Sequence, residues 1–184
     1  PNPTISLSSQ NTYCSGEPIT ITDNGSNGDT WNWMGPNSFS STTNPMVISN
    51  SNTLNSGTYT LEVSNNAGCQ TQTDFSFDVF AVEPIEIETD EPPCTGSTLA
   101  LSFSETVENI ERQTWTGPGG FNSALTFPTI ANPTNLNSGT YFVTVTYETG
   151  CTTSTSQEIT ISPTPSLQVT SNDPNCVEDN LNIE

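Results

Sequence analysis

Residues 55–69 read Asn-Ser-Gly-Thr-Tyr-Thr-Leu-Glu-Val-Ser-Asn-Asn-Ala-Gly-Cys, and residues 137–151 read Asn-Ser-Gly-Thr-Tyr-Phe-Val-Thr-Val-Thr-Tyr-Glu-Thr-Gly-Cys. In each copy a polar turn precedes a run in which apolar residues occupy every second position, which is typical of a β-strand with one buried face. A further turn and a cysteine end both copies. The offset of 82 residues between the copies indicates a tandem array of similar units.

Prolines mark where each unit begins. Pro3, Pro84 and Pro165 each open an alternating strand, and successive prolines lie 81 residues apart. We therefore predict a first repeat, a second repeat and the first strand or strands of a truncated third, at residues 3–83, 84–164 and 165–184.

A strand that carries tryptophan leads into a Gly-Pro turn in both repeats. Residues 33–39 read Trp-Met-Gly-Pro-Asn-Ser-Phe, and residues 115–121 read Trp-Thr-Gly-Pro-Gly-Gly-Phe. Turn formers separate the strands every 8 to 12 residues, and no helical period is evident. The pattern predicts an all-β fold in which each repeat is an antiparallel sandwich of about seven strands. Prolines at residues 82–84 and 162–165 predict repeats standing end to end on short, stiff linkers.

The five cysteines follow the same period. Each full repeat holds two, so we infer the pairs Cys14–Cys69 and Cys94–Cys151, with Cys176 left unpaired by truncation. A bridge closing a loop of about 56 residues stabilises a domain by about 4 kcal/mol on the chain-entropy estimate. Stable disulfides predict an extracellular protein. Reduced buried cysteines or a metal site are the alternatives, although no CxxC motif and no histidine occur.

Acidic residues dominate the charge. Twenty Asp and Glu oppose a single basic residue, Arg112, so the net charge is −19. A polyanion is repelled by nucleic acid and by anionic lipid, and neither is an expected partner. No apolar run approaches the roughly 18 residues that span a bilayer, so we expect no direct membrane insertion.

The tyrosine of the repeated stretch resembles a known feature of immunoglobulin-like domains. Tyr59 and Tyr141 resemble the tyrosine that enters strand F and bonds upstream backbone through its hydroxyl, and Trp33 and Trp115 resemble the tryptophan of strand C. We expect structural roles for all four. The cysteines depart from the family, because they follow the tyrosine by ten residues rather than two. The resemblance then implies a disulfide near one end of each sandwich.

The combined motifs resemble the tandem immunoglobulin-like repeats of very large surface proteins in Bacteroidetes-type bacteria. These include SprB-like gliding-motility adhesins, which the type IX secretion system exports. The resemblance implies a semi-rigid stalk in adhesion or gliding motility, located at the cell surface and associated with the outer membrane. The expected partners are neighbouring repeats, with surface polysaccharide or a lateral copy of the filament as further candidates.

Catalysis lacks its usual residues, because without histidine or lysine the chain can form no Ser-His-Asp, Cys-His or lysine-nucleophile arrangement. We predict that it is not an enzyme and binds no organic cofactor. Calcium is a weaker hypothesis, since carboxylates suit it. The candidates lie in one loop and near the joint between the repeats: Asp23, Asp29, Glu88, Asp90 and Glu91. Neither group has EF-hand spacing or recurs in the other repeat, and solvated loops are the competing interpretation.

Trp31 has no counterpart in the second repeat, where Gln113 takes its place. It is a candidate platform for sugar stacking, and an edge residue that covers the apolar end of the sandwich is the alternative. The alternative function is therefore a carbohydrate-binding module of a secreted protein. An accessory domain of a receptor or an enzyme is the third class.

Overall fold

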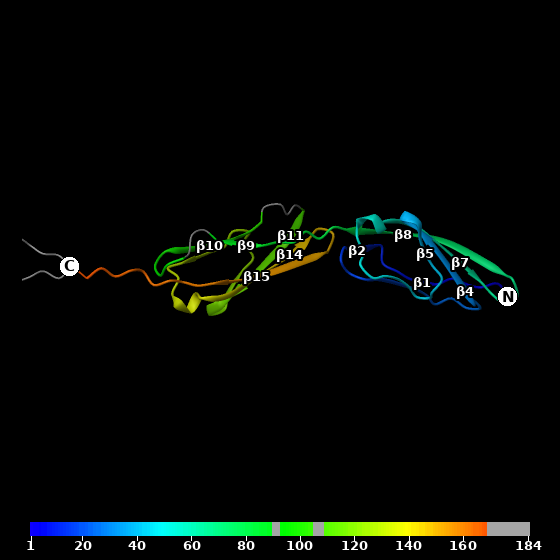
Figure 1. The fold of residues 1–184 in the computed structure, drawn as a ribbon, viewed down its shortest axis with the longest axis horizontal. Coiled ribbons are helices and arrows are strands. Elements are labelled where there is room, and N and C mark those ends of the chain that lie inside the picture. Colours follow the sequence, from blue (N-terminus) through cyan, green and yellow to red (C-terminus); the bar gives the residue numbers. More distant parts are fainter. Residues whose placement is uncertain (90–92, 105–108, 169–184) are drawn as a thin grey trace, which may run out of the picture.

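The computed structural model describes residues 1–89, 93–104 and 109–168. It contains two β-sandwiches that follow one another along an elongated molecule, with the N-terminus at one end and the segment leading to residue 168 at the other (Figure 1). Each hydrophobic core draws its residues from one repeat of the sequence. The all-β fold with tandem sandwiches is as predicted from the sequence.

The first sandwich packs a three-stranded sheet against a five-stranded one. The smaller sheet has the order β1 (Leu7–Ser8), β3 (Ile19–Asp23), β6 (Met46–Ile48). The larger has the order β2 (Thr12–Cys14), β8 (Gln70–Phe80), β7 (Gly57–Ser64), β4 (Thr30–Gly35), β5 (Phe39–Ser41). All of these pairs are antiparallel except β2 with β8, which is parallel.

The second sandwich repeats the plan. Its smaller sheet has the order β13 (Thr129–Ala131), β10 (Thr98–Phe103), β9 (Ile87–Thr89). Its larger sheet has the order β12 (Phe121–Ser123), β11 (Ile110–Gly117), β14 (Gly139–Tyr147), β15 (Thr152–Ile159). A single parallel bridge between Cys94 and Ser162 takes the place of the β2–β8 pair. In each unit the N-terminal segment thus pairs first with the smaller sheet and then with the last strand of the larger sheet or the residues just after it, and both units are immunoglobulin-like sandwiches.

Short 3₁₀ turns connect the strands, at η1 (Pro36–Ser38), η2 (Thr53–Asn55), η3 (Pro118–Gly120) and η4 (Asn135–Asn137). None of the helices in the described ranges has the length and apolar character needed to cross a membrane.

The recurrent motifs meet in the core of each repeat. Trp33 is fully buried. It shares one hydrophobic cluster with Tyr59, Leu61 and Val63, the alternate residues of β7 that face the core. The Tyr59 hydroxyl donates to the carbonyl of Asn55 over 2.9 Å. Burial of the ring raises the pKa of Tyr59 above its ordinary value. The side chain of Tyr59 therefore fills the core with its ring and, through its hydroxyl, holds the turn that precedes β7.

The second repeat reproduces this corner. Trp115 and Tyr141 are fully buried, the Tyr141 hydroxyl donates to Asn137 O over 2.8 Å, and burial raises the pKa of Tyr141. A Cβ on Gly117 would lie 2.5 Å from the Tyr141 ring, and a Cβ on Gly35 would overlap Tyr59 in the same way. The Gly-Pro turn thus needs glycine because the corner tyrosine packs directly on its backbone.

Candidate functional site: the joint between the repeats

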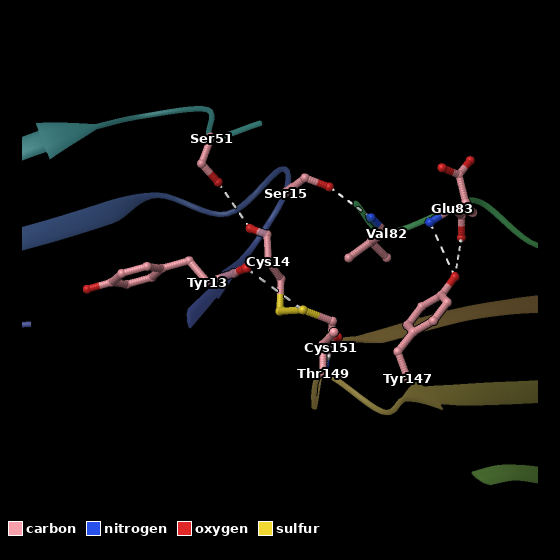
Figure 2. The surroundings of a disulfide bond; sticks show 9 residues. All are labelled: Tyr13, Cys14, Ser15, Ser51, Val82, Glu83, Tyr147, Thr149 and Cys151. Carbon is pink, nitrogen blue, oxygen red and sulfur yellow. Dashed lines mark hydrogen bonds between the residues drawn. A yellow bond between two sulfur atoms is a disulfide. The ribbon is translucent and has the colours of Figure 1, made fainter. Parts of the chain in front are cut away.

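A disulfide joins the two repeats. Cys14, the last residue of β2, is bonded to Cys151, which follows the turn after β14, and 137 residues separate them (Figure 2). Their Cα atoms are 5.7 Å apart, within the usual range for a disulfide. Cys151 is 2% exposed. Cys14 is partly buried, and the bridge therefore lies between the two domains and not within either of them.

The predicted pair Cys14–Cys69 is wrong, because the two cysteines lie at opposite ends of the first sandwich. Strand β2 runs parallel to β8 with Cys14 opposite Phe80, the last residue of β8. Cys69 immediately precedes the first residue of β8. Since a strand rises about 3.3 Å per residue, the 11 residues of β8 separate the two positions by roughly 36 Å.

The predicted pair Cys94–Cys151 is wrong for the same reason. The backbone of Cys94 forms a parallel β-bridge with Ser162, which lies beyond the end of β15. Cys151 immediately precedes that strand and so lies at its other end. Cys151 is bonded to Cys14 instead. Cys176 lies outside the described residues. Each sandwich thus carries one cysteine at each end, a placement that two cysteines per repeat do not reveal by themselves.

Hydrogen bonds to two side chains, Ser15 and Tyr147, hold the linker backbone beside the bridge. The Val82 amide donates to the Ser15 hydroxyl over 2.9 Å, so the chain leaving the first repeat is tied to the residue after Cys14. The Tyr147 hydroxyl accepts from the Glu83 amide over 3.2 Å and donates to the Glu83 carbonyl over 3.3 Å (Figure 2). Tyr147 is 7% exposed. One side chain from the second repeat therefore bonds both backbone polar groups of a linker residue.

The backbone that carries the bridge is itself supported. The Ser51 hydroxyl donates to the carbonyl of Cys14 over 3.0 Å, and Ser51 is buried. The carbonyl oxygen of Tyr13 lies 4.0 Å from the Cys151 sulfur, a packing contact, because a disulfide sulfur carries no proton. The backbone at Cys14 is thus held by a hydrogen bond from Ser51 and by the pairing of β2 with β8.

Two residues that the sequence suggested for different sites are in contact with each other. Asp23 accepts from the amides of Ser6 and Gly25 through Oδ1, over 2.8 and 2.9 Å, and from the Trp31 indole through Oδ2 over 3.0 Å. Asp23 is 7% exposed, and Trp31 is half-buried against the core. Both carboxylate oxygens are committed to protein donors. Asp23 is thus bonded to a tryptophan that packs against the hydrophobic core, which gives both residues a structural role.

The structure does not gather the other calcium candidates. Asp29 Oδ2 accepts from the Asn66 amide over 2.8 Å, and Glu88 is exposed on the edge strand β9. Asp90 and Glu91 lie outside the described residues. Within the described ranges there is no group of three or more histidine, cysteine, aspartate or glutamate residues that could hold a metal ion.

No protein-family model matches the chain, and no curated protein matches it in sequence. Solved structures with a similar fold include the amphioxus IgVJ-C2 molecule, at 19% identity and a TM-score of 0.40, covering 82% of this chain and 99% of that one. Murine CEACAM1b matches at 10% identity and a TM-score of 0.43, covering 89% of this chain and 100% of its own. The three N-terminal domains of the bacteriophage RB49 highly immunogenic outer capsid protein match at 18% identity and a TM-score of 0.41, with coverages of 87% and 59%.

Proposed function

We propose that this chain is part of an extracellular stalk that transmits tension, in a large bacterial surface adhesin or filament of the gliding-motility type. The observation that carries the proposal is the disulfide from Cys14 in one repeat to Cys151 in the next. A disulfide between two immunoglobulin-like domains is consistent with an extracellular location. The acidic, nearly base-free composition favours solubility over binding to nucleic acid or lipid.

The bridge changes how a pulling force passes through the molecule. Because Cys14 and Cys151 are covalently joined, tension applied at the two ends of the chain runs through the sulfur atoms and bypasses the residues between them. Only residues 1–14 and 151–184 can then be extended. Bridges inside each repeat, Cys14–Cys69 and Cys94–Cys151, would leave residues 69–94, which include the linker, in the line of force as well.

Single-molecule force spectroscopy tests this proposal. With the bridge intact, residues 1–14 and 151–184 extend to roughly 170 Å in total, whereas the fully unfolded chain of 184 residues extends to roughly 640 Å. We expect the shorter limit in oxidising buffer and the longer one after reduction. A double variant, Cys14→Ser with Cys151→Ser, is the matched control and should extend beyond the shorter limit in both buffers. Extension to the longer limit by the oxidised natural chain would refute the proposal.

Surface location is tested separately. Antibodies against the two sandwiches should label intact cells of the organism that encodes the chain, and labelling only after permeabilisation would contradict the cell-surface assignment. The carbohydrate-binding alternative needs Trp31 as an open platform. Its half-buried ring and its bond to Asp23 favour the stalk.

A further inference from the structure

We propose that Cys69 is half of a second inter-repeat bridge, which it forms with the cysteine that another repeat of this class carries in the position of Cys14. The partner is thus the far end of a like repeat placed before residue 1 in an array, and the inference rests on the proposed stalk function. Cys69 is partly exposed and forms no disulfide in the described chain. Its bonded counterpart Cys151 supplies the independent observation of what this position takes.

Cys69 and Cys151 lie at equivalent positions in equivalent turns of the two repeats. The amide of Asn65 donates to Cys69 O over 3.1 Å, and the amide of Tyr147 donates to Cys151 O over 2.8 Å. Within each turn the glycine before the cysteine has positive φ, +81° at Gly68 and +85° at Gly150, and donates back over 2.9 or 2.8 Å. The backbone therefore presents both cysteines at the same end of their sandwiches.

The chain that enters each repeat is held at the same place. Asn65 corresponds to Tyr147, and its side-chain amide donates to the carbonyl of Pro1 over 3.0 Å, as the Tyr147 hydroxyl donates to the carbonyl of Glu83 over 3.3 Å. A hollow of about 310 Å³ lies beside this contact, lined by Pro1, Asn27, Asp29, Asn65, Asn66 and Ala67. A preceding repeat would thus approach this end as the first repeat approaches the second.

The opposite end of the second repeat reproduces the bonded end of the first. Cys94 pairs in parallel with Ser162 as Cys14 pairs with Phe80. Thr164 N donates to Thr95 Oγ1 over 3.0 Å, as Val82 N donates to Ser15 Oγ over 2.9 Å. Each repeat therefore carries two cysteines at opposite ends. Cys14 and Cys94 lie at the end that faces the following repeat, and Cys69 and Cys151 lie at the end that faces the preceding one. A series of inter-repeat disulfides requires this arrangement.

Bridge formation is a two-electron oxidation. Two thiols become one disulfide and release two protons and two electrons, which a disulfide oxidant such as glutathione disulfide takes up to become two thiols. The test therefore uses a glutathione redox buffer during refolding.

A lengthened chain tests the inference directly. Residues 1–83, with Cys69→Ser, are placed before residues 3–184, so that an added copy of the first repeat precedes the natural one. A protease that cleaves after glutamate, except before proline, then separates the cysteines. We expect fragment 1–62 of the added copy linked to fragment 63–86 of the natural copy, which carries Cys69. We also expect fragment 149–158, which carries Cys151, linked to the fragment containing Cys14 of the natural copy.

The control variant replaces Cys14 of the added copy by serine, and Cys69 should then be fully alkylated by iodoacetamide. If Cys69 is alkylated while the bridge to Cys151 is present, the inference is overturned and the proposed function stands. If the bridge to Cys151 is also missing, the proposed function fails with it.

Discussion

Asp23 in the first repeat and Phe103 in the second occupy the same place and fill it by opposite means. Each ends the central strand of the smaller sheet, Asp23 opposite Leu7 and Phe103 opposite Ile87. Both are buried, at 7% and 5% exposure. The carboxylate is bonded by three donors, whereas the phenyl ring packs on Trp115 with centroids 6.0 Å apart. The fold fixes a space, and either an apolar ring or a fully bonded charge can occupy it.

The neighbouring residue changes with it. Trp31 donates its indole N–H to Asp23, whereas Gln113, at the same position of the second repeat, donates to the carbonyl of Ala124 over 2.8 Å. The acceptor for Trp31 is thus present only where the tryptophan is. Asp23 and Trp31 are therefore bonded to each other in the first repeat, and both are replaced in the second, by Phe103 and Gln113.

The change Phe103→Asp has the largest expected effect on the free energy of unfolding. It places a carboxylate in the second repeat without the indole donor, and we expect a loss of about 4 kcal/mol or more in the free energy of unfolding. Urea unfolding followed by Trp115 fluorescence measures it. The control Phe103→Leu keeps an apolar group and should cost about 1.5 kcal/mol. Equal losses for the two variants would show that charge is not the cause.

Removal of the bridge affects both repeats. If either sandwich unfolds alone, the bridge closes a loop of about 70 residues between the joint and Cys14 or Cys151, so it should stabilise each by about 4 kcal/mol. The double variant Cys14→Ser with Cys151→Ser should lower both unfolding transitions, reported by the fluorescence of Trp31 and Trp33 for the first repeat and Trp115 for the second. Loss in only one repeat would contradict a bridge at the joint.

The change Asp23→Ala leaves the donors of Ser6, Gly25 and Trp31 without their acceptor. We expect the first repeat to lose about 2 to 3 kcal/mol, because unpaired buried donors carry a desolvation cost. The matched control is Asp29→Ala, which removes one exposed bond to Asn66 and should cost less than about 1 kcal/mol. Chemical denaturation measures both, and similar losses would remove the special role of Asp23.

The smallest expected effect is the difference in stability between phenylalanine variants of the two core tryptophans. Trp33 donates its indole N–H to the carbonyl of Thr43 over 2.9 Å, whereas the buried indole N–H of Trp115 has no hydrogen-bond partner in the described residues. Both phenylalanine variants lose similar volume, but only Trp33→Phe breaks a bond. We expect Trp33→Phe to cost about 1 kcal/mol more than Trp115→Phe. Thermal unfolding of each variant gives the difference, and the reverse order would contradict the bonding pattern.

The sequence predicts the features that local periodicity reports. Alternation, turn formers and the recurrent motifs indicate two sandwiches with buried Trp33 and Trp115, and the structure has them. The cysteine partners depend instead on long-range register, because the parallel pairing of β2 with β8 decides which end of the sandwich Cys14 occupies. Two cysteines per repeat are equally compatible with bridges inside repeats and between them.

The contact between Asp23 and Trp31 did leave a signal in the sequence. When the repeats are aligned on their cysteines and tryptophans, Asp23 faces Phe103 and Trp31 faces Gln113, so two unusual residues occur in the same repeat. Joint departure from a repeat pattern indicates that two side chains compensate each other. Considered separately, each residue resembled a ligand-binding candidate.

Disulfide mapping of the oxidised natural chain is the most direct test of the inter-repeat bridge. Cleavage after glutamate, except before proline, places Cys14 in fragment 1–62, Cys69 in fragment 63–86 and Cys151 in fragment 149–158. The structure predicts that mass spectrometry without reduction finds fragment 1–62 joined to fragment 149–158. Fragment 1–62 joined to fragment 63–86 would show a bridge within the repeat and would contradict the account.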